Sequence, residues 1–299
     1  MTRALTEQFT LVRPGDVGII GDPIEHSLSP VMHNAAFKTW WGAFRDRDEP
    51  TPTYHRFLVK PEELEEAIHL MKEHRMRGLN ITVPHKLAVC RYVDFLSPFA
   101  KRTGAVNTLS FSGKRVSGYN TDADGFKRAV SWDLDFNPEG KTVLVLGAGG
   151  TGRVITFSLL DMLAQKVFLW NRSPGPLEAV LKDQDEDVER IVPLQTPLDL
   201  IHAMKEAALV VNATSVGLNL KDGLPAEGLK FTPYHVVFDV IYHRETALLQ
   251  QARMAGAKTS GGLGMLVYQG ARSFEIWTGS PAPLEIMKTV LSQTVQGVN

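Results

Sequence analysis

The sequence KTVLVLGAGGTG, residues 141–152, joins a short apolar run to a turn with four glycines. The run from Lys141 to Leu146 predicts a buried strand, and the residues after the turn, as far as Leu163, predict a helix. Between a strand and a helix, such glycines permit a tight turn and let backbone N–H groups approach a pyrophosphate. We therefore expect a dinucleotide-binding unit here; a purely structural turn is the alternative.

The next predicted strand, residues 167–170, ends at Asn171-Arg172-Ser173. An NAD-selective site usually has Asp or Glu at this place to hold the ribose diol, whereas a cation favours the 2′-phosphate of NADP. Arg172 therefore argues for NADP; a solvated loop arginine is the alternative. Two further buried strands are expected within residues 209–217 and 236–242, with polar or glycine-bearing ends that would line the nicotinamide end of the site.

A second chemical motif lies earlier in the chain, in LNITVPHK at residues 79–86. Asn80 and Thr82 are two residues apart, so on an extended strand their side chains point to the same face. Pro84 suits the end of a strand, and Lys86 would follow on the first turn of a helix. Such a group would hold a polyhydroxylated small molecule against a base; a strand end with a solvated lysine is the alternative.

Two hydroxyl groups precede a predicted helix at residues 30–38. Ser27 and Ser29 come just before Pro30, and together with the N–H groups of a helix N-terminus they would bind a carboxylate. Ser29 acting only as the helix N-cap is the alternative.

The surrounding segments predict alternating strands and helices. Residues 38–52, which include Trp40 and Trp41, are expected to form a charged surface excursion, and a strand is expected at 54–59. The following helix has apolar residues at positions 64, 67, 68 and 71, and it leads into the Asn80 strand as a β-α-β unit.

Three further polar residues stand at places where a ligand could be reached. Asn107 lies in a predicted strand at 104–109, and Asp122 lies in a turn-rich segment, residues 118–126, that runs into a helix. Asx turns and helix caps are the alternative for both. Gln269 flanks the apolar stripe of a helix that follows Gly262, and a last helix is expected at about 284–295.

Composition narrows the class of protein. The 299 residues carry 32 basic and 33 acidic side chains, a net charge of -1, which gives no support for binding nucleic acid or an anionic membrane. Small-molecule partners are therefore expected. The single cysteine, Cys90, excludes an internal disulfide framework, and neither a signal peptide, a membrane span nor a metal-site spacing is recognisable. A cytoplasmic protein is predicted.

Together, these segments resemble the shikimate dehydrogenase family over nearly the whole chain, from Gly18 to Gly279. The resemblance rests on SLSPVMHNAAF at 27–37, NITVPHK at 80–86, GAVNTL at 104–109, GYNTDADG at 118–125, GAGGTGR at 147–153, NATSVG at 212–217 and GLGMLVYQGA at 262–271. It implies two α/β domains: a substrate-binding domain, residues 1–126 plus 263–299, and a Rossmann-type NADP-binding domain, residues 127–262.

The resemblance also implies the roles of individual residues. Lys86 paired with Asp122 would be the acid/base, and the substrate, shikimate or 3-dehydroshikimate, would be held by Ser27, Ser29, Asn80, Thr82, Asn107, Tyr242 and Gln269. Cofactor-binding positions would be Gly147, Ala148, Gly149, Gly150, Thr151, Gly152, Asn171, Arg172, Ser173, Thr214, Gly262 and Met265. A monomer or homodimer is expected, without a metal.

Two departures from the family pattern bear on these implications. Tyr242-His243-Arg244 stands where the family often reads Tyr-Asn-Pro, and residues 174–176 read PGP where NADP-preferring members often carry a second arginine. NAD is therefore kept as a second cofactor. A quinate-preferring dehydrogenase and a non-catalytic sensor of shikimate-like metabolites are the alternative functions.

Overall fold

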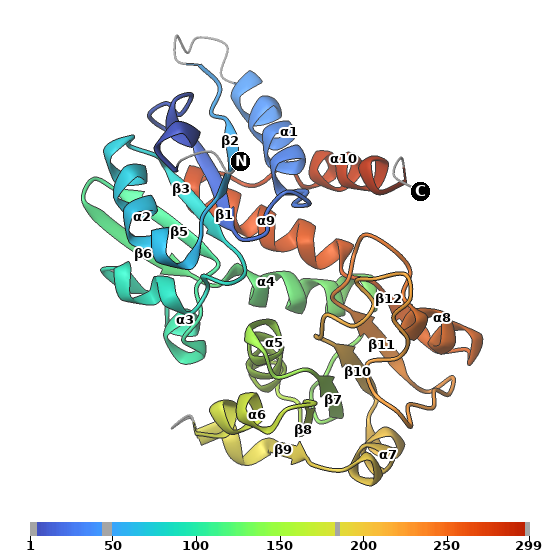
Figure 1. The fold of residues 1–299 in the computed structure, drawn as a ribbon. Coiled ribbons are helices and arrows are strands. Elements are labelled where there is room, and N and C mark those ends of the chain that lie inside the picture. The colour runs from blue at the N-terminus through green and yellow to red at the C-terminus, as the bar shows by residue number, and fades with distance from the viewer. Residues whose placement is uncertain (1–4, 44–49, 183–185, 297–299) are drawn as a thin grey trace. The chain divides into compact units, whose positions relative to one another are not determined.

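The computed structural model describes residues 5–43, 50–182 and 186–296, and it divides the chain into two compact units. Unit 1 contains residues 1–121 and 269–299, and unit 2 contains residues 122–268. Each unit has its own sheet covered by helices, which confirms the predicted fold of two α/β domains (Figure 1). The boundaries expected at residues 126 and 263 stay a prediction.

The sheet of unit 1 has six strands in the order β2-β1-β3-β5-β6-β4. β1 (Val17–Gly21) lies between the parallel strands β2 (Tyr54–Leu58) and β3 (Gly78–Ile81). β5 (Thr108–Ser112) runs antiparallel to both β3 and β6 (Arg115–Tyr119), and β4 (Phe95–Leu96) pairs parallel with β6. The strand predicted at 104–109 begins later because Gly104 ends helix α3 (Pro98–Thr103) in the left-handed conformation.

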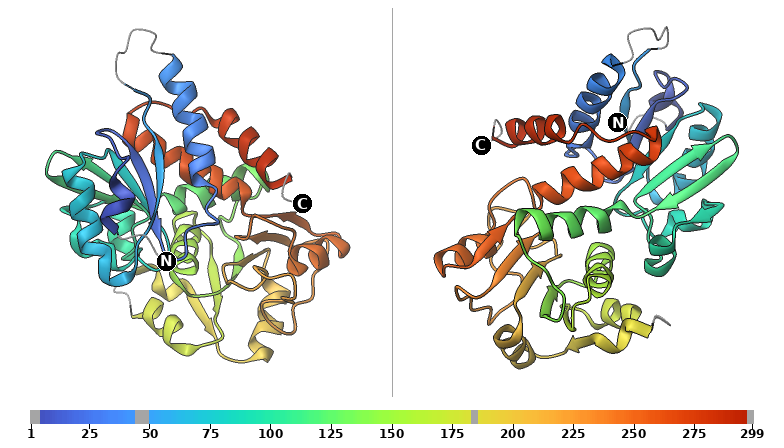
Figure 2. Two further views of the ribbon diagram at one scale, coloured as in Figure 1. Left: turned by 45° about the horizontal axis from the view of Figure 1, so that its top comes forward. Right: turned by 180° about the vertical axis from the view of Figure 1, so that it is seen from behind.

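Alternation along β3 assigns the two faces of this sheet. Leu79 and Ile81 point into the apolar core formed with the 3₁₀ helix η1 (Leu5–Phe9) and with α2 (Leu64–Glu73), whose predicted apolar positions are all buried. Gly78 and Asn80 face the other side, which is covered by α1 (Ser29–Gly42) and α9 (Leu263–Thr278) (Figure 2). A Cβ at Gly78 would lie 1.9 Å from Nε1 of Trp277 in α9, so only glycine fits there.

Shorter elements complete unit 1. The 3₁₀ helices η2 (Pro61–Glu63) and η3 (Ala88–Tyr92) precede α2 and follow β3, and α10 (Leu284–Gln296) packs beside α1.

The sheet of unit 2 is wholly parallel, in the order β12-β11-β10-β7-β8-β9. Counted from β7 this is 6-5-4-1-2-3, the order of a Rossmann sheet. The strands are β7 (Thr142–Leu146), β8 (Lys166–Trp170), β9 (Ile191–Leu194), β10 (Leu209–Asn212), β11 (Val236–Asp239) and β12 (Lys258–Ser260). The strand order reverses between β7 and β10, and ligands bind beyond the carboxyl ends of strands at such a point.

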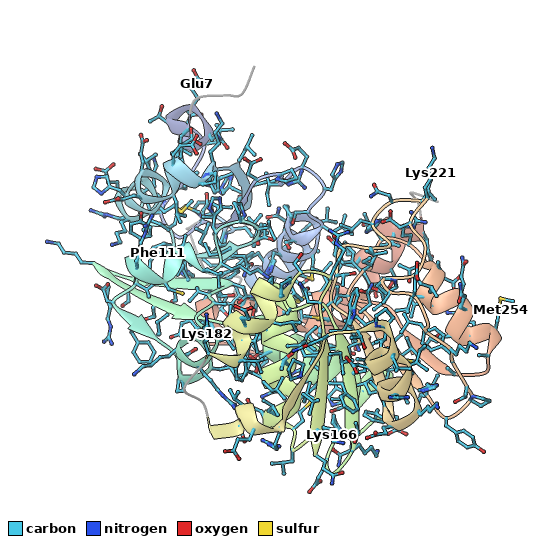
Figure 3. The ribbon with its side chains drawn as sticks, turned by 60° about the horizontal axis from the view of Figure 1, so that its bottom comes forward. Glu7, Phe111, Lys166, Lys182, Lys221 and Met254 are labelled. Atoms are coloured by element: carbon cyan, nitrogen blue, oxygen red, sulfur yellow. The ribbon has the colours of Figure 1, made fainter. Side chains whose placement is uncertain are left out.

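Helices cover both faces of the unit 2 sheet. α7 (Pro197–Glu206) and α8 (Ala247–Met254) pack on the face that carries Leu144, Val210 and Val237. The opposite face carries Phe238, whose ring centroid lies 5.5 Å from that of Phe126 in α4 (Thr121–Arg128). The remaining helices are the π-helical turn η4 (Ala129–Asp133), α5 (Gly150–Asp161), α6 (Pro174–Leu181) and the 3₁₀ helix η5 (Glu186–Arg190). Lys221 and Met254 project outward (Figure 3).

Three local predictions were wrong. α1 continues to Gly42, so Trp40 and Trp41 are helical residues, and Trp40 packs edge-on against Phe274 of α9; residues 44–49 of the expected excursion lie outside the described residues. Leu28, not Ser29, occupies the N-cap position of α1. Ser29 is the first residue of the helix, and no side chain caps the helix at this position. Lys86 lies in a turn, because the helical backbone begins only at Ala88.

A buried carboxylate fixes the amino end of the unit 1 sheet. Asp16 precedes β1 and accepts hydrogen bonds from the backbone N–H groups of Thr53 (2.8 Å) and Arg13 (2.9 Å), and it lies 2.8 Å from Nε2 of His55. Burial alone would raise the pKa of Asp16, but the bonds from His55 and the two backbone groups favour the carboxylate, and the net result is a lowered pKa.

The substitution Asp16→Asn is expected to lower the free energy of unfolding at pH 7 by about 1.5–3 kcal/mol, because an amide oxygen cannot replace both carboxylate oxygens. A carboxyl group with a lowered folded-state pKa stabilises the protein above its unfolded-state pKa and loses that effect as the pH falls through the folded-state value. The difference from the parent protein should therefore shrink below about pH 4. Urea unfolding of both proteins at pH 7 and pH 3 measures this difference in the free energy of unfolding.

The matched control is Asp94→Asn, which removes an exposed carboxylate that accepts the N–H of Val116 at 2.7 Å. It should change stability by less than about 0.5 kcal/mol. Equal losses in the two variants, or an Asp16→Asn difference that is undiminished at pH 3, would contradict this account.

Candidate active site

Six buried side chains of unit 1 form a hydrogen-bonded group, here called the amide–hydroxyl cluster: Asn80, Asn107, Thr108, Thr121, Gln269 and Ser273. Asn80 and Thr108 are directly opposite each other in the antiparallel pair of β3 and β5, so their side chains meet on one face, with Nδ2 3.0 Å from Oγ1. From α9, Oγ of Ser273 lies 3.0 Å from Asn80 Nδ2 and 2.8 Å from Thr108 Oγ1. Two strands and a helix thus converge on Asn80.

Asn107 connects this cluster to the start of α4. Its Oδ1 accepts the backbone N–H of Thr121 at 2.7 Å, and its Nδ2 lies 3.0 Å from Thr121 Oγ1 and 3.4 Å from Gln269 Oε1. Gln269, predicted to flank the apolar stripe of its helix and to bind substrate, is 9% exposed. The structure therefore brings together three of the predicted binding residues, Asn80, Asn107 and Gln269.

The two predicted carboxylate-binding serines lie at the start of α1. Ser27 Oγ accepts the N–H of Ser29 at 3.3 Å. The side chain of Ser29 is buried. The Tyr54 hydroxyl, from β2, donates to Asn80 Oδ1 at 2.7 Å and so joins the amide–hydroxyl cluster.

Thr82 and Lys86 follow β3, at the carboxyl end of that strand. The carbonyl oxygen of Lys86 accepts the N–H of Val106 at 2.8 Å. Since Val106 directly precedes Asn107, this bond holds the Lys86 turn next to Asn107. The thiol of Cys90 also donates toward the Lys86 carbonyl oxygen, at 3.7 Å, and burial raises the pKa of this thiol.

Two predicted residues lie in unit 2. Asp122 is in the first turn of α4 and follows Thr121 directly in the chain, and Tyr242 follows β11. Burial raises the pKa of the Tyr242 phenol. The pairing of Lys86 with Asp122 and the role of Tyr242 stay predictions.

The glycine turn between β7 and α5 has the close contacts that its residue types predict. Gly147 has φ +104°, and a Cβ there would lie 2.9 Å from the carbonyl oxygen of Ala213, just after β10. A Cβ at Gly152 would lie 1.9 Å from the carbonyl oxygen of Gly147. At Gly149 and Gly150, by contrast, a Cβ would meet no atom within 4 Å. The outer glycines close the turn, and the inner ones leave space open at the start of α5.

This turn fits a pyrophosphate group. α5 begins at Gly150, its N-cap residue Gly149 makes no side-chain cap bond, and the positive end of a helix dipole attracts an anion. Asn171 Oδ1 accepts the Ala148 N–H at 3.0 Å and its Nδ2 donates to the Ser173 carbonyl oxygen at 2.8 Å, so this predicted cofactor residue ties the turn to the loop after β8. Arg172, in that loop, is exposed.

Hydrogen bonds also fix the loop after β10. Asn212 Oδ1 accepts from the N–H and the hydroxyl of Thr214, at 3.1 and 2.7 Å. The carboxylate of Asp239 in turn accepts from Asn212 Nδ2 at 3.0 Å and from the Thr246 hydroxyl at 2.7 Å; burial raises the pKa of Asp239. The predicted cofactor residue Thr214 is therefore held by a network that starts on β11.

The remaining two predicted cofactor residues lie where the chain enters α9. A Cβ at Gly262 would lie 2.1 Å from the carbonyl oxygen of Val240, and the Met265 side chain is buried. Gly262 is therefore required for close backbone packing, whatever its contact with a cofactor.

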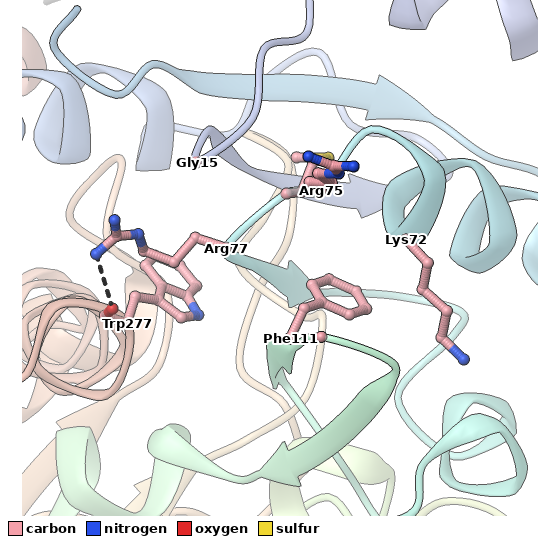
Figure 4. A pocket seen from close by; sticks show the side chains of 8 residues that line it. Gly15, Lys72, Arg75, Arg77, Phe111 and Trp277 are labelled. Atoms are coloured by element: carbon pink, nitrogen blue, oxygen red, sulfur yellow. Dashed lines mark hydrogen bonds between the residues drawn. The ribbon is translucent and has the colours of Figure 1, made fainter. Parts of the chain in front are cut away.

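A separate hollow of about 610 Å³ lies at the amino ends of β1 and β3 and is lined by Lys72, Arg75 and Arg77 (Figure 4). Lys72 and Arg75 stand at the C-terminus of α2, and Arg77 donates to the Trp277 carbonyl oxygen at 3.4 Å, near the C-terminus of α9. Helix C-termini attract cations, and Lys72 points away from Arg77. The helix ends therefore account for these cations without a ligand.

Four members of the unit 1 network, besides Asn212, Asp239 and Thr246 in unit 2, were not predicted as site residues from the sequence. Thr108 and Thr121 stand inside the GAVNTL and GYNTDADG motifs, and Ser273 follows Gln269 by four residues on one helix face, which are signals that could have been used. Tyr54 carries no such signal, because it reads as an ordinary strand residue.

Within the described ranges, no helix is both long and apolar enough to span a bilayer.

Comparison with known proteins agrees with the geometry. Residues 19–109 match the shikimate dehydrogenase substrate binding domain, and residues 262–291 match the shikimate 5'-dehydrogenase C-terminal domain. Shikimate dehydrogenase (NADP(+)) of Desulforamulus reducens is 38% identical over 288 residues, which cover 93% of this chain and 94% of the relative.

Two solved structures are similar over the same extent. Shikimate 5-dehydrogenase from Thermus thermophilus in complex with NADP(H) and shikimate is 33% identical, with a TM-score of 0.79 over 93% of this chain and 99% of the other. Quinate dehydrogenase from Corynebacterium glutamicum in complex with NAD is 28% identical, with a TM-score of 0.82 over 94% and 99%.

The two kinds of glycine in the turn after β7 should respond differently to alanine. Gly152→Ala is expected to lower the free energy of unfolding by at least about 1–3 kcal/mol, because the added methyl group would collide with a backbone oxygen. Gly149→Ala should stay within about 0.5 kcal/mol of the parent protein, since its methyl group meets open space. Urea unfolding followed by circular dichroism compares the two; equal stabilities would contradict the packing described for Gly152.

Proposed function

The chain belongs to the shikimate dehydrogenase family, and on this premise we propose that it catalyses the reversible, NADP-dependent reduction of 3-dehydroshikimate to shikimate. The observation that carries the proposal is the buried amide–hydroxyl cluster at Asn80, Asn107 and Gln269, in the same unit as Ser27, Ser29 and Lys86. The similarity to shikimate dehydrogenase (NADP(+)) and to the Thermus thermophilus enzyme in complex with NADP(H) and shikimate supports this substrate and this cofactor.

The polar groups of unit 1 suit the parts of such a substrate. The hydroxyls of Ser27 and Ser29 at the start of α1 would bind the carboxylate, where the helix N-terminus adds favourable N–H groups. Amide side chains both donate and accept hydrogen bonds, so Asn80, Asn107 and Gln269 would bind ring hydroxyls, which do the same. Thr82 would add a hydroxyl group next to them, and Tyr242 would assist at the carboxylate.

Lys86 is the residue that we assign to proton transfer. Oxidation of an alcohol requires a proton acceptor at the hydroxyl oxygen, and reduction of a ketone requires a donor at the same atom. The Lys86 amine would serve both directions, and Asp122 would orient it. The position of Lys86 in the turn beside Asn107 supports this assignment.

The cofactor would bind to unit 2. Bound NADP supplies the hydride acceptor of the reaction. The pyrophosphate would lie at the open start of α5, over Gly149 and Gly150, and Arg172 would pair with the 2′-phosphate. Thr214, Ser173, Thr151 and Met265 would complete the site. We assign residues 127–262 to the dinucleotide-binding domain and the rest to the substrate-binding domain, in a cytoplasmic enzyme.

Two alternative functions remain distinguishable. The Corynebacterium glutamicum quinate dehydrogenase complex with NAD makes a quinate- or NAD-preferring enzyme the nearer alternative, and a sensor without catalysis is the more distant one. Nicotinamide reduction at 340 nm, measured with shikimate or quinate and with NADP or NAD, decides between them. Our proposal requires the highest kcat/KM for shikimate with NADP; the absence of turnover would favour a sensor.

The substitution Lys86→Ala should lower kcat by roughly 100- to 10,000-fold, the usual effect of removing a positioned proton-transfer group. Thermal unfolding should be nearly unchanged, because the side chain is partly exposed. The matched control is Lys114→Ala, which removes an exposed lysine from the β5–β6 turn of the same unit. Near-normal turnover of Lys86→Ala would exclude Lys86 from proton transfer.

The substitution Arg172→Asp should weaken NADP binding by roughly 10- to 100-fold and shift preference toward NAD, because it replaces a charge-assisted bond with repulsion of the 2′-phosphate. Lys221→Asp changes net charge equally at an outward-pointing site of the same unit and serves as the control. Fluorescence titration with NADPH and NADH measures both affinities. Unchanged NADPH affinity in Arg172→Asp would refute the role of Arg172.

A further inference from the structure

Tyr54 contacts a residue that the proposed function assigns to the ring hydroxyls of the substrate. It is the first residue of β2, and it is buried, with 2% of its surface exposed. Its hydroxyl donates to Asn80 Oδ1 at 2.7 Å. A side chain of β2 therefore reaches a predicted substrate-binding residue of β3.

The bond from Tyr54 settles how the Asn80 amide is oriented. Asn80 Nδ2 carries two hydrogens, and three acceptors lie within 3.2 Å of it: Ser273 Oγ, Thr108 Oγ1 and the carbonyl oxygen of Asn107. Nδ2 therefore has no hydrogen left for a ligand. Asn80 Oδ1 receives one hydrogen bond from Tyr54, which leaves its second lone pair to accept from a substrate hydroxyl.

The Tyr54 ring is itself held by α1. His33 stacks on it with ring centroids 4.4 Å apart and an interplanar angle of 4°. The Asn34 side chain binds both backbone groups of Tyr54: its Oδ1 accepts the Tyr54 N–H at 2.8 Å, and its Nδ2 donates to the Tyr54 carbonyl oxygen at 3.2 Å. Burial lowers the pKa of His33 to about 3, so the stacked ring is neutral at physiological pH. The helix that begins at Ser29 thus also fixes where the Tyr54 hydroxyl lies.

We propose that Tyr54 is a positioning residue for substrate binding, whose hydroxyl orients the Asn80 amide while His33 holds its ring and Asn34 holds its backbone. This inference rests on the proposed function, because it assumes that Asn80 binds substrate. Tyr54 itself does not take part in proton or hydride transfer. A purely structural role would affect only stability.

The substitution Tyr54→Phe removes the hydroxyl and keeps the stacked ring. We expect the KM for shikimate to rise by roughly 10-fold, as for loss of one buried hydrogen bond. The KM for NADP should stay within about twofold, and kcat within about threefold, because the groups that bind cofactor and transfer the proton are untouched. Because KM does not depend on how much enzyme is active, partial unfolding of the variant would lower the maximal rate without imitating this result.

Tyr268→Phe is the matched control. Tyr268 is as buried a residue as Tyr54, and its hydroxyl donates to Asp133 Oδ1 at 2.6 Å in unit 2, so the variant loses a tyrosine hydrogen bond that does not touch Asn80. It should leave the KM for shikimate unchanged.

A double-mutant cycle adds an independent measurement. If Tyr54 acts through Asn80, Tyr54→Phe should raise the KM for shikimate less in an Asn80→Ala background than in the parent enzyme. An unchanged KM in Tyr54→Phe, an equal rise in Tyr268→Phe, or fully additive effects in the cycle would overturn the inference. An inactive parent enzyme would instead refute the proposed function.

Discussion

The pairing of β5 against β3 is the constraint on which the amide–hydroxyl cluster depends. It sets Thr108 opposite Asn80 and leaves Asn107, one residue earlier, to hold the start of α4. Because side chains alternate between the faces of a strand, a shift of one residue in this register would turn Thr108 away from Asn80. The bonds from Ser273 to both Asn80 and Thr108 require that register as well.

In unit 2 the corresponding constraint is the space between β7 and β10, where the order of strands reverses. Gly147 and Gly152 are needed because backbone oxygens occupy the positions of their side chains. The network from Asp239 through Asn212 to Thr214 fixes the other side of the same opening. Close backbone packing therefore shapes the β7 side of this opening, and buried hydrogen bonds fix the β10 side.

Much of the fold could be predicted from the sequence because its periodicity is strong. The apolar positions of α2 and the strand–glycine–helix run at 141–163 left few alternatives, and they were confirmed. The sequence could not predict that β5 runs antiparallel to its neighbours, because the composition of a strand does not encode its direction in the sheet. Trp40 and Trp41 were misassigned because neighbouring charges obscured a helix whose buried side depends on Phe274, more than 200 residues away in the chain.

The candidate site was predicted less completely, for a physical reason. Motifs identify side chains such as Lys86 and Arg172 by residue type and spacing, but the partners that orient them are set by tertiary contacts. Tyr54 meets Asn80 only because β2 and β3 flank the same strand, with their side chains on one face. Gln269 is buried only because Thr121 and Asn107 reach it from another segment.

The thiol of Cys90 has a consequence for handling the protein. It donates toward the Lys86 and Gly104 carbonyl oxygens, and burial holds its pKa above the ordinary value. Thiolates, not thiols, attack alkylating reagents and peroxides. This partly buried sulfur should therefore react with such reagents more slowly than an exposed cysteine does.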